Sequence, residues 1–189
     1  MQLDKVLKDV CDKSLCLYTK AEIDIALGNM AKEMNVKLAN SNPIFLCVLL
    51  GAVVPMGSLL PLLNFRLEID YIHFSSYRAE NKMDELILKT EPSSDFSGRT
   101  VVIFDDILDT SITLKAAIEY CKKRQAKDVY TAVLVDKQKS EPRVANGVER
   151  ADFTALTVND VFVFGYGLDY LGYLRNLPGI YTLDDKIKS

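Results

Sequence analysis

Three apolar runs divide the chain, and helical or polar segments separate them. The runs are Ile44–Leu50, Thr100–Phe104 and Val129–Val135. Each is apolar at successive positions rather than at alternate ones, which is typical of a strand buried on both faces of a parallel sheet. We therefore expect three buried strands, the first of which ends at Gly51.

Helical patterns lie beside these runs. Thr19 and Glu22 have the spacing of a capping box, in which a hydroxyl and a carboxylate bind the first free amides of a helix. Apolar residues then recur at helical spacing: Ile23, Leu27, Met30 and Met34. This pattern predicts a helix of about 15 residues. Thr113–Arg124 predicts a second helix, and the segment after Gly51 predicts a short one that breaks near Pro61.

The middle of the chain alternates between extended and polar segments. Leu67–Tyr77 is rich in β-branched and aromatic residues and predicts a strand, whereas Arg78–Glu85 is polar and loop-like. Leu86–Lys89 predicts a short strand, and Glu91–Gly98 a loop. The alternation of strands with helices indicates an α/β fold with an open, mainly parallel central sheet flanked by helices.

Composition narrows the class of protein. The chain has 189 residues, of which 49% are hydrophobic and 26% charged, and we expect residues 1–189 to form a single domain. A net charge of −3 argues against a nucleic-acid partner. No apolar run approaches the roughly 20 residues that span a bilayer, and Met1–Asp12 lacks a secretory pattern. The four cysteines lack metal-ligand spacing, so we expect a cytoplasmic protein.

The most informative segment is Asp105–Thr113. It begins where an apolar run ends and finishes where a helix begins, the usual place for a ligand in an open α/β sheet. Paired carboxylates bind ribose hydroxyls or Mg²⁺, and the amides at a helix N-terminus bind phosphate. Helix capping explains one or two of these residues but not three acids in five positions.

Two segments together resemble a known family. Asp105–Thr113 resembles the phosphoribosyl pyrophosphate (PRPP) motif of type I phosphoribosyltransferases. Val161–Tyr170, followed by Arg175, resembles the carboxyl-terminal signature of the hypoxanthine-guanine phosphoribosyltransferases. The resemblance covers most of the chain from Ile44 onward and is weakest over residues 139–150. It implies the type I phosphoribosyltransferase fold, with a small hood built from the terminal segments.

The resemblance also assigns the sugar-phosphate site. Asp105 and Asp106 would hold the ribose hydroxyls and, with Asp169, Mg²⁺. The 5′-phosphate would lie against one loop: Asp109, Thr110, Ser111, Ile112 and Thr113. Many family members have glycine where this chain has Ser111, and a serine there either crowds the phosphate or adds a donor to it.

Pyrophosphate and lid residues follow by position. Leu50, Gly51 and Arg175 would contact pyrophosphate, although many relatives carry a cation at the position of Leu50. The resemblance places a cis peptide bond between Leu50 and Gly51. Ser76 and Tyr77 would begin a mobile lid over residues 76–88.

The purine would be read by a different group of residues. Lys137 would donate to O6 of the base, Phe162 would stack on its ring, and Val163 and Asp169 would complete the base site. Adenine carries an amino group at C6, so a permanent donor facing it leaves both groups unpaired.

The implied activity is purine salvage with Mg²⁺: the phosphoribosyl group of PRPP passes to N9 of hypoxanthine or guanine, with Asp109 as general base or acid. A homodimer or homotetramer is expected. Two alternatives remain open. A non-catalytic regulatory member of the same fold would bind nucleotide or RNA. A phospho-acceptor receiver domain also sets two acids and a lysine at strand ends, but its acid pair follows the first strand, whereas several predicted elements precede Asp105.

Overall fold

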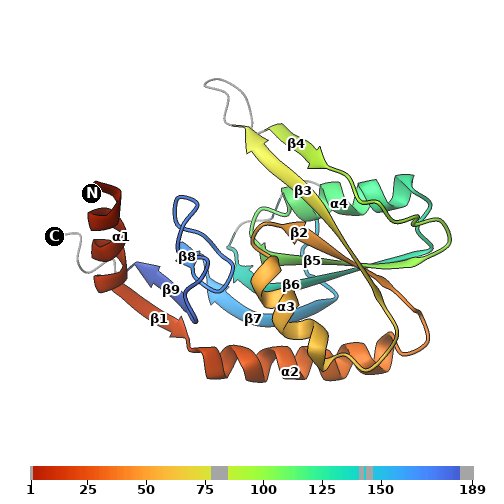
Figure 1. The fold of residues 1–189 in the computed structure, drawn as a ribbon, viewed down its shortest axis with the longest axis horizontal. Coiled ribbons are helices and arrows are strands. Elements are labelled where there is room, and N and C mark those ends of the chain that lie inside the picture. The colour runs from red at the N-terminus through yellow and green to blue at the C-terminus, as the bar shows by residue number, and fades with distance from the viewer. Residues whose placement is uncertain (1, 78–84, 141–142, 144–146, 184–189) are drawn as a thin grey trace.

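The computed structural model describes residues 2–77, 85–140, 143 and 147–183. Its main sheet has six strands in the order β4-β3-β2-β5-β6-β7 (Figure 1). Their bounds are β2 (Ile44–Leu49), β3 (Glu68–Tyr77), β4 (Glu85–Thr90), β5 (Thr100–Leu108), β6 (Asp128–Gln138) and β7 (Phe153–Asn159). Only the β3–β4 pairing is antiparallel. This confirms the predicted open, mainly parallel sheet.

Helices cover both faces of this sheet. Alternate residues of β2 face different cores, because side chains of a strand point to opposite sides. Phe45 and Cys47 pack in the core shared with α2 (Lys20–Lys37) and α3 (Val53–Leu59). Ile44, Leu46 and Val48 pack in the core shared with α4 (Ile112–Lys123). The chain is therefore three layers deep, and β2 is buried on both faces as its apolar run predicts.

A second, smaller sheet joins the two ends of the chain. It has the order β1-β9-β8, with bounds β1 (Ser14–Tyr18), β8 (Val163–Phe164) and β9 (Ile180–Leu183), and α1 (Gln2–Asp12) precedes it. Figure 1 shows it beside the main sheet. Because only a short loop separates β7 from β8, this sheet lies at the carboxyl edge of the main sheet. It is the predicted hood.

Local signals near the amino terminus are confirmed. Thr19 caps α2, since its side chain accepts from the Glu22 amide while Glu22 accepts from the Thr19 amide. The helix is 18 residues long, longer than predicted. After α3 the chain tightens into a 3₁₀ turn, Leu60–Leu62, which contains Pro61 and matches the predicted break.

Two strands run further than their apolar patterns. β5 continues to Leu108 because it pairs with β6 that far, and β6 continues to Gln138 because it pairs with β7 that far. Asp105, Asp106 and Lys137 therefore lie within strands, not after them as predicted. None of the helices in the described ranges combines the length and apolar character needed to cross a bilayer.

Candidate active site

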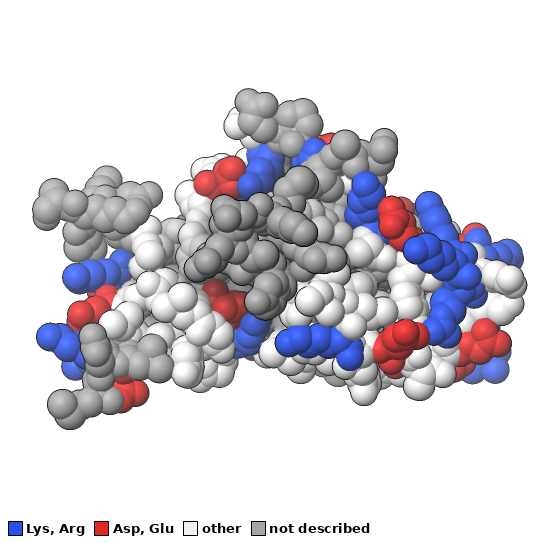
Figure 2. Space-filling model, turned by 90° about the horizontal axis from the view of Figure 1, so that it is seen from above, with Lys and Arg blue, Asp and Glu red and all other residues white. Residues whose placement is uncertain are grey.

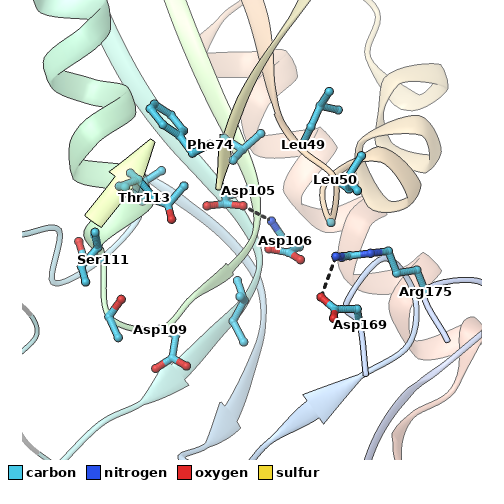
Figure 3. A pocket seen from close by; sticks show the side chains of 17 residues that line it. Leu49, Leu50, Phe74, Asp105, Asp106, Asp109, Ser111, Thr113, Asp169 and Arg175 are labelled. Carbon is cyan, nitrogen blue, oxygen red and sulfur yellow. Dashed lines mark hydrogen bonds and ion pairs between the residues drawn. The ribbon is translucent and has the colours of Figure 1, made fainter. Parts of the chain in front are cut away.

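A cavity of about 260 Å³ opens at the carboxyl edge of the main sheet, against β2 and β5 (Figure 3). Phe74 of β3 and Leu86 of β4 close one side of it. All of the residues predicted for ribose phosphate, pyrophosphate and metal line it together: Leu50, Gly51, Asp105, Asp106, Asp109, Thr110, Ser111, Ile112, Thr113, Asp169 and Arg175. The predicted base residues Lys137, Phe162 and Val163 are not part of its lining.

Two adjacent acids form the floor of the cavity. Asp105 is 6% exposed, and its carboxylate accepts a hydrogen bond from the Asp106 amide at 2.9 Å. Burial raises the pKa of Asp105 well above its ordinary value, and the charge of Asp106 adds to this. Burial also raises the pKa of Asp106, although Asp105 and Arg175 oppose the shift. A bound cation or a set of hydroxyl donors would stabilise the ionised form of these two carboxylates.

The donor set fits a metal that is shared with a substrate. No group of three or more acids, cysteines or histidines within the described residues could hold a metal by itself. The predicted trio with Asp169 does not assemble, because Asp169 instead pairs with Arg175 at 2.7 Å and accepts from the Gly172 amide. Mg²⁺ commonly takes one or two carboxylates and completes its shell with phosphate oxygens and water. Asp105 and Asp106 supply such carboxylates.

Ser111 is the N-cap residue that precedes α4, and it has the backbone conformation that favours glycine, with a φ of 73°. The residue is only 4% exposed, and its hydroxyl oxygen accepts a hydrogen bond from the Val148 amide at 2.5 Å. The hydroxyl is thus held away from the start of the helix, where it makes no capping bond. A serine is accommodated where many family members have glycine, and its own proton stays available to donate.

Gly51 is required by a close approach. A Cβ on Gly51 would lie 1.6 Å from a carboxylate oxygen of Asp106. A Cβ on Gly167, whose φ is +105°, would lie 2.2 Å from the Gly51 carbonyl oxygen. The cis peptide bond joins Leu49 to Leu50, one residue earlier than predicted. Gly51 is therefore explained by its contact with Asp106 and not by the cis bond.

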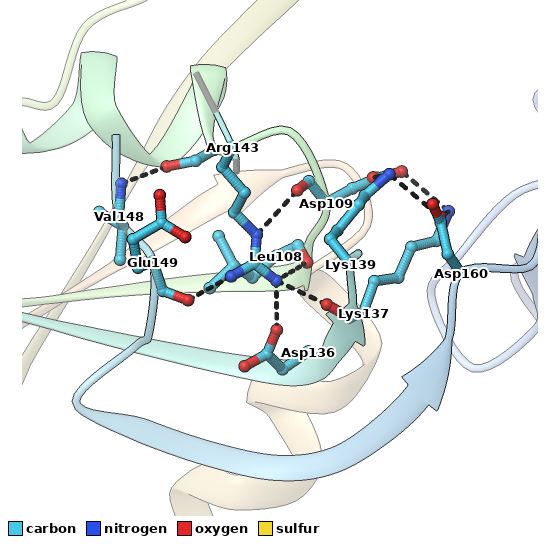
Figure 4. Close-up of polar contacts among 10 residues, drawn as sticks. Leu108, Asp109, Asp136, Lys137, Lys139, Arg143, Val148, Glu149 and Asp160 are labelled. Atoms are coloured by element: carbon cyan, nitrogen blue, oxygen red, sulfur yellow. Dashed lines mark hydrogen bonds and ion pairs between the residues drawn. The ribbon is translucent and has the colours of Figure 1, made fainter. Parts of the chain in front are cut away.

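On the base side, two lysines hold one carboxylate (Figure 4). The Lys137 ammonium lies 2.9 Å from one oxygen of Asp109, and the Lys139 ammonium 2.5 Å from the other. Both also face Asp160, at 3.9 and 3.0 Å. Partial burial works to raise the pKa of Asp109, but the two lysines outweigh it and the pKa is lowered. Asp109 thus links the cavity, which it lines, to the predicted base residue Lys137.

Phe162 offers an open aromatic surface at the edge of the hood. It is 51% exposed, and its ring meets that of Tyr170 edge-on at 5.9 Å. Its carbonyl accepts from the Thr182 hydroxyl at 2.7 Å, which ties it to β9. Val163 begins β8 and is 5% exposed, so its backbone rather than its side chain borders this site.

The structure describes only part of the predicted lid, residues 76–88. Ser76 and Tyr77 end β3, where their backbones pair with Leu86 and Glu85 of β4. The prediction of a strand after the polar segment is confirmed, and residues 78–84 lie outside the described part of the chain.

Three site residues were missed from the sequence: Lys139, Arg143 and Asp160. Lys139 had a usable signal, because it lies two residues beyond Lys137 and side chains of a strand repeat with period two. Asp160 and Arg143 come from connections without periodicity, and only the fold brings Asp160 to Lys139 and Arg143 to Asp109.

These features define the class of protein. The phosphoribosyl transferase domain family matches residues 17–171, so the chain belongs to that family. It is 35% identical over 174 residues to the hypoxanthine-guanine phosphoribosyltransferase of Streptococcus pneumoniae, which covers 92% of this chain and 94% of that protein. It is 29% identical to the hypoxanthine-guanine-xanthine phosphoribosyltransferase of Tritrichomonas foetus, over 93% and 94% of the two chains.

Comparison with solved structures leads to the same family. A hypoxanthine phosphoribosyltransferase from Staphylococcus aureus superimposes with a TM-score of 0.83 at 28% identity, covering 93% of this chain and 94% of that one. The type I phosphoribosyltransferase fold expected from the sequence is confirmed.

Proposed function

We propose that this chain transfers the phosphoribosyl group of PRPP to N9 of hypoxanthine or guanine, giving IMP or GMP and pyrophosphate, in purine salvage. The contact between Lys137 and Asp109 carries the proposal, because it sets a base-reading cation beside the sugar-phosphate cavity. The relatives at 35% and 29% identity are named for the same class of reaction.

PRPP would occupy the cavity at the carboxyl edge of the sheet. Its 5′-phosphate would rest on the loop from Asp109 to Thr113, where α4 begins and its free amides and dipole favour an anion. The ribose hydroxyls would donate to Asp105 and Asp106. The pyrophosphate would face Leu50 and Gly51, with Arg175 as the nearby cation. Leu50 is 55% exposed and brings no charge, so Arg175 carries more of this task.

Lys137 would choose the base. A 6-oxopurine presents an acceptor at C6, and Lys137 presents only donors. Its side chain is 10% exposed, so an unpaired group there is costly. Adenine would therefore be rejected. Phe162 would stack on the ring from its exposed face, while the Val163 backbone and Asp169 complete the site.

Asp109 would act on the proton of the base. N9 forms a bond to C1 of ribose while the bond from C1 to pyrophosphate breaks, and the base loses one proton. The lowered pKa keeps Asp109 ionised, so its carboxylate can accept that proton at N7. Positioned proton acceptors of this kind typically contribute about 10²–10⁴-fold.

Mg²⁺ would be held by Asp105 and Asp106 together with substrate oxygens, and when bound it supplies positive charge against the departing pyrophosphate. Arg175 adds charge on the same side and also donates to the Gly167 carbonyl at 2.6 Å, which fixes its direction. Electrostatic stabilisation of this kind is often the largest single contribution to catalysis.

A non-catalytic RNA-binding role is less well supported. On the face shown in Figure 2, blue and red patches lie beside one another instead of forming one basic surface. The sequence pI of about 5.3 agrees with this. All four cysteines are free thiols, which suits our expectation of a cytoplasmic enzyme. A homodimer or homotetramer remains a prediction that the native mass would test.

Steady-state turnover tests the function. The protein should form nucleotide from PRPP with hypoxanthine or guanine when Mg²⁺ is present, and should turn over adenine far more slowly. Chelation of Mg²⁺ should abolish the reaction. Saturable binding of RNA without nucleotide synthesis would instead support the regulatory alternative.

A further inference from the structure

One guanidinium group joins the two strands that carry the proposed chemistry. Arg143 donates from Nε to the Asp109 carbonyl at 2.9 Å, and from Nη2 to the carbonyls of Leu108 and Lys137 at 3.2 and 2.7 Å. It also contacts the Asp136 carboxylate through Nη2. The Glu149 carbonyl accepts from its Nη1. Figure 4 shows these contacts converging on the single side chain.

The acceptors belong to functional segments. Leu108 ends β5 and Asp109 follows it at once, while Asp136 and Lys137 lie near the end of β6. The Arg143 side chain is 6% exposed and that of Asp136 is 10% exposed, so water cannot replace these contacts easily. A buried carbonyl or carboxylate without a partner is costly.

We propose that Arg143 is a positioning residue, which sets the spacing between the proton acceptor Asp109 and the base reader Lys137. This inference rests on the proposed function and deepens it. Arg143 does not line the cavity, and it acts through the main chain on both sides of the pair. No part of the sequence pattern assigns it a role.

The arginine side chain is specifically suited to this task. Its planar group carries five donors in a fixed arrangement, and the contacts here reach four carbonyls and one carboxylate, three of which share the two hydrogens of Nη2. A lysine can pair with Asp136 but brings three donors from a single nitrogen atom, so it cannot span both strands. A lysine would therefore keep the charge that faces Asp136, but it would lose the planar geometry that sets the spacing between β5 and β6.

Arg143→Lys separates these two roles. The thermal midpoint should fall, because some of the buried carbonyls lose their donor, but the protein should still fold because the charge facing Asp136 is retained. Its kcat/KM for hypoxanthine should nevertheless fall by roughly 10-fold or more, since small displacements in a site cost about that much. Asp136→Asn is the matched variant: Arg143 keeps its four carbonyls, so the midpoint should fall while kcat/KM stays within about threefold.

Product binding gives a second readout that a loss of stability would not produce. IMP and AMP differ at C6, which Lys137 is proposed to read. Arg143→Lys should weaken IMP binding by about 10-fold and AMP binding far less. In a Lys137→Gln background, Arg143→Lys should leave the ratio of the IMP and AMP dissociation constants unchanged within about twofold, because the residue it positions is gone.

Three results would overturn the proposal: an unfolded Arg143→Lys protein, unchanged kcat/KM in that variant, or an equal effect on the IMP:AMP ratio in both backgrounds. Each is distinct from a failure of the proposed function, which would appear as a folded parent protein that is inactive with every 6-oxopurine.

Discussion

The ammonium group of Lys137 and the carboxylate of Asp109 lie 2.9 Å apart and form an ion pair. Lys137, which is proposed to read the base, and Asp109, which is proposed to accept its proton, are therefore each other's partner in this structure. A purine that binds through O6 and N7 would enter between them and take over both contacts. Lys139 stays on the second oxygen of Asp109, so the carboxylate keeps one cationic partner when Lys137 turns to the base.

Replacing Lys137 tests the choice of base. Lys137→Gln removes the permanent donor but keeps an amide that donates and accepts. Hypoxanthine and guanine should lose about 1.5–3 kcal/mol of transition-state binding, the usual value of a charged hydrogen bond, and adenine should lose little. The measurement is the ratio of kcat/KM for hypoxanthine and adenine in both proteins. A ratio that stays constant within about threefold would show that Lys137 does not read the base.

Asp109→Asn tests proton transfer. The amide has the size of the carboxylate but accepts no proton, so kcat should fall by about 10²-fold or more. Lys139→Gln is the companion variant: it leaves Asp109 in place but removes one of its cations, so the loss should be smaller. Lys122→Gln, on an exposed residue late in α4, serves as the control and should behave like the parent. A loss of less than tenfold in Asp109→Asn would reduce Asp109 to a loop-shaping residue.

Asp105→Asn should stabilise the protein without substrate. Burial and the charge of Asp106 hold the pKa of Asp105 above its ordinary value, so the folded state binds this proton more tightly than the unfolded state. The free energy of unfolding therefore falls as pH rises from the ordinary pKa toward the folded one. The variant lacks this group, and its thermal midpoint at about pH 8 should exceed that of the parent by about 2–4 °C for each kcal/mol released.

The pH dependence supplies the check on Asp105. The difference in thermal midpoint should shrink as pH is lowered to about 4, where the parent carboxyl is already protonated in the folded state. The same variant should raise the KM for PRPP, because it loses a ribose contact. An equal midpoint difference at every pH would contradict the raised pKa, and an unchanged KM would remove Asp105 from the ribose site.

Gly51→Ala should disrupt the cavity. The new methyl group would lie 1.6 Å from the Asp106 carboxylate, so either the loop or Asp106 has to move, and kcat/KM for PRPP should drop by about 10²-fold. Gly57→Ala in α3 is the matched control. Nothing lies within 4 Å of its Cβ position, and the change should stabilise the helix by about 0.5–1 kcal/mol. Similar activity in the two variants would show that the close approach is unimportant.

The sequence predicted the parts of the fold that depend on local pattern. Ile44–Leu49 and the helix capped by Thr19 were recognisable because burial on both faces and capping leave direct marks on residue order. The ends of β5 and β6 were misjudged, because Asp105 and Lys137 are polar residues typical of loops although their backbones stay paired within the sheet.

Contacts between distant segments left no such mark. β1 and β9 pair across almost the whole chain, and neither was predicted as a strand. Arg143 reaches Asp109 from a connection with no periodicity. The family resemblance supplied the roles of the site residues, and the cavity brings many of them together, but the lysine pair on Asp109 emerged only from the geometry.

Gly51 lines the cavity, and Gly167 packs against its carbonyl group from behind, so main chain meets main chain at this side of the site. Substitution is blocked at both positions, because a Cβ on Gly51 would collide with the Asp106 carboxylate and a Cβ on Gly167 with the Gly51 carbonyl oxygen. Variation can enter the pyrophosphate side only through neighbours such as Leu50, which is exposed and unconstrained by that contact. Natural or engineered changes in leaving-group affinity should therefore accumulate at Leu50, while the two glycines remain the rigid frame against which such changes act.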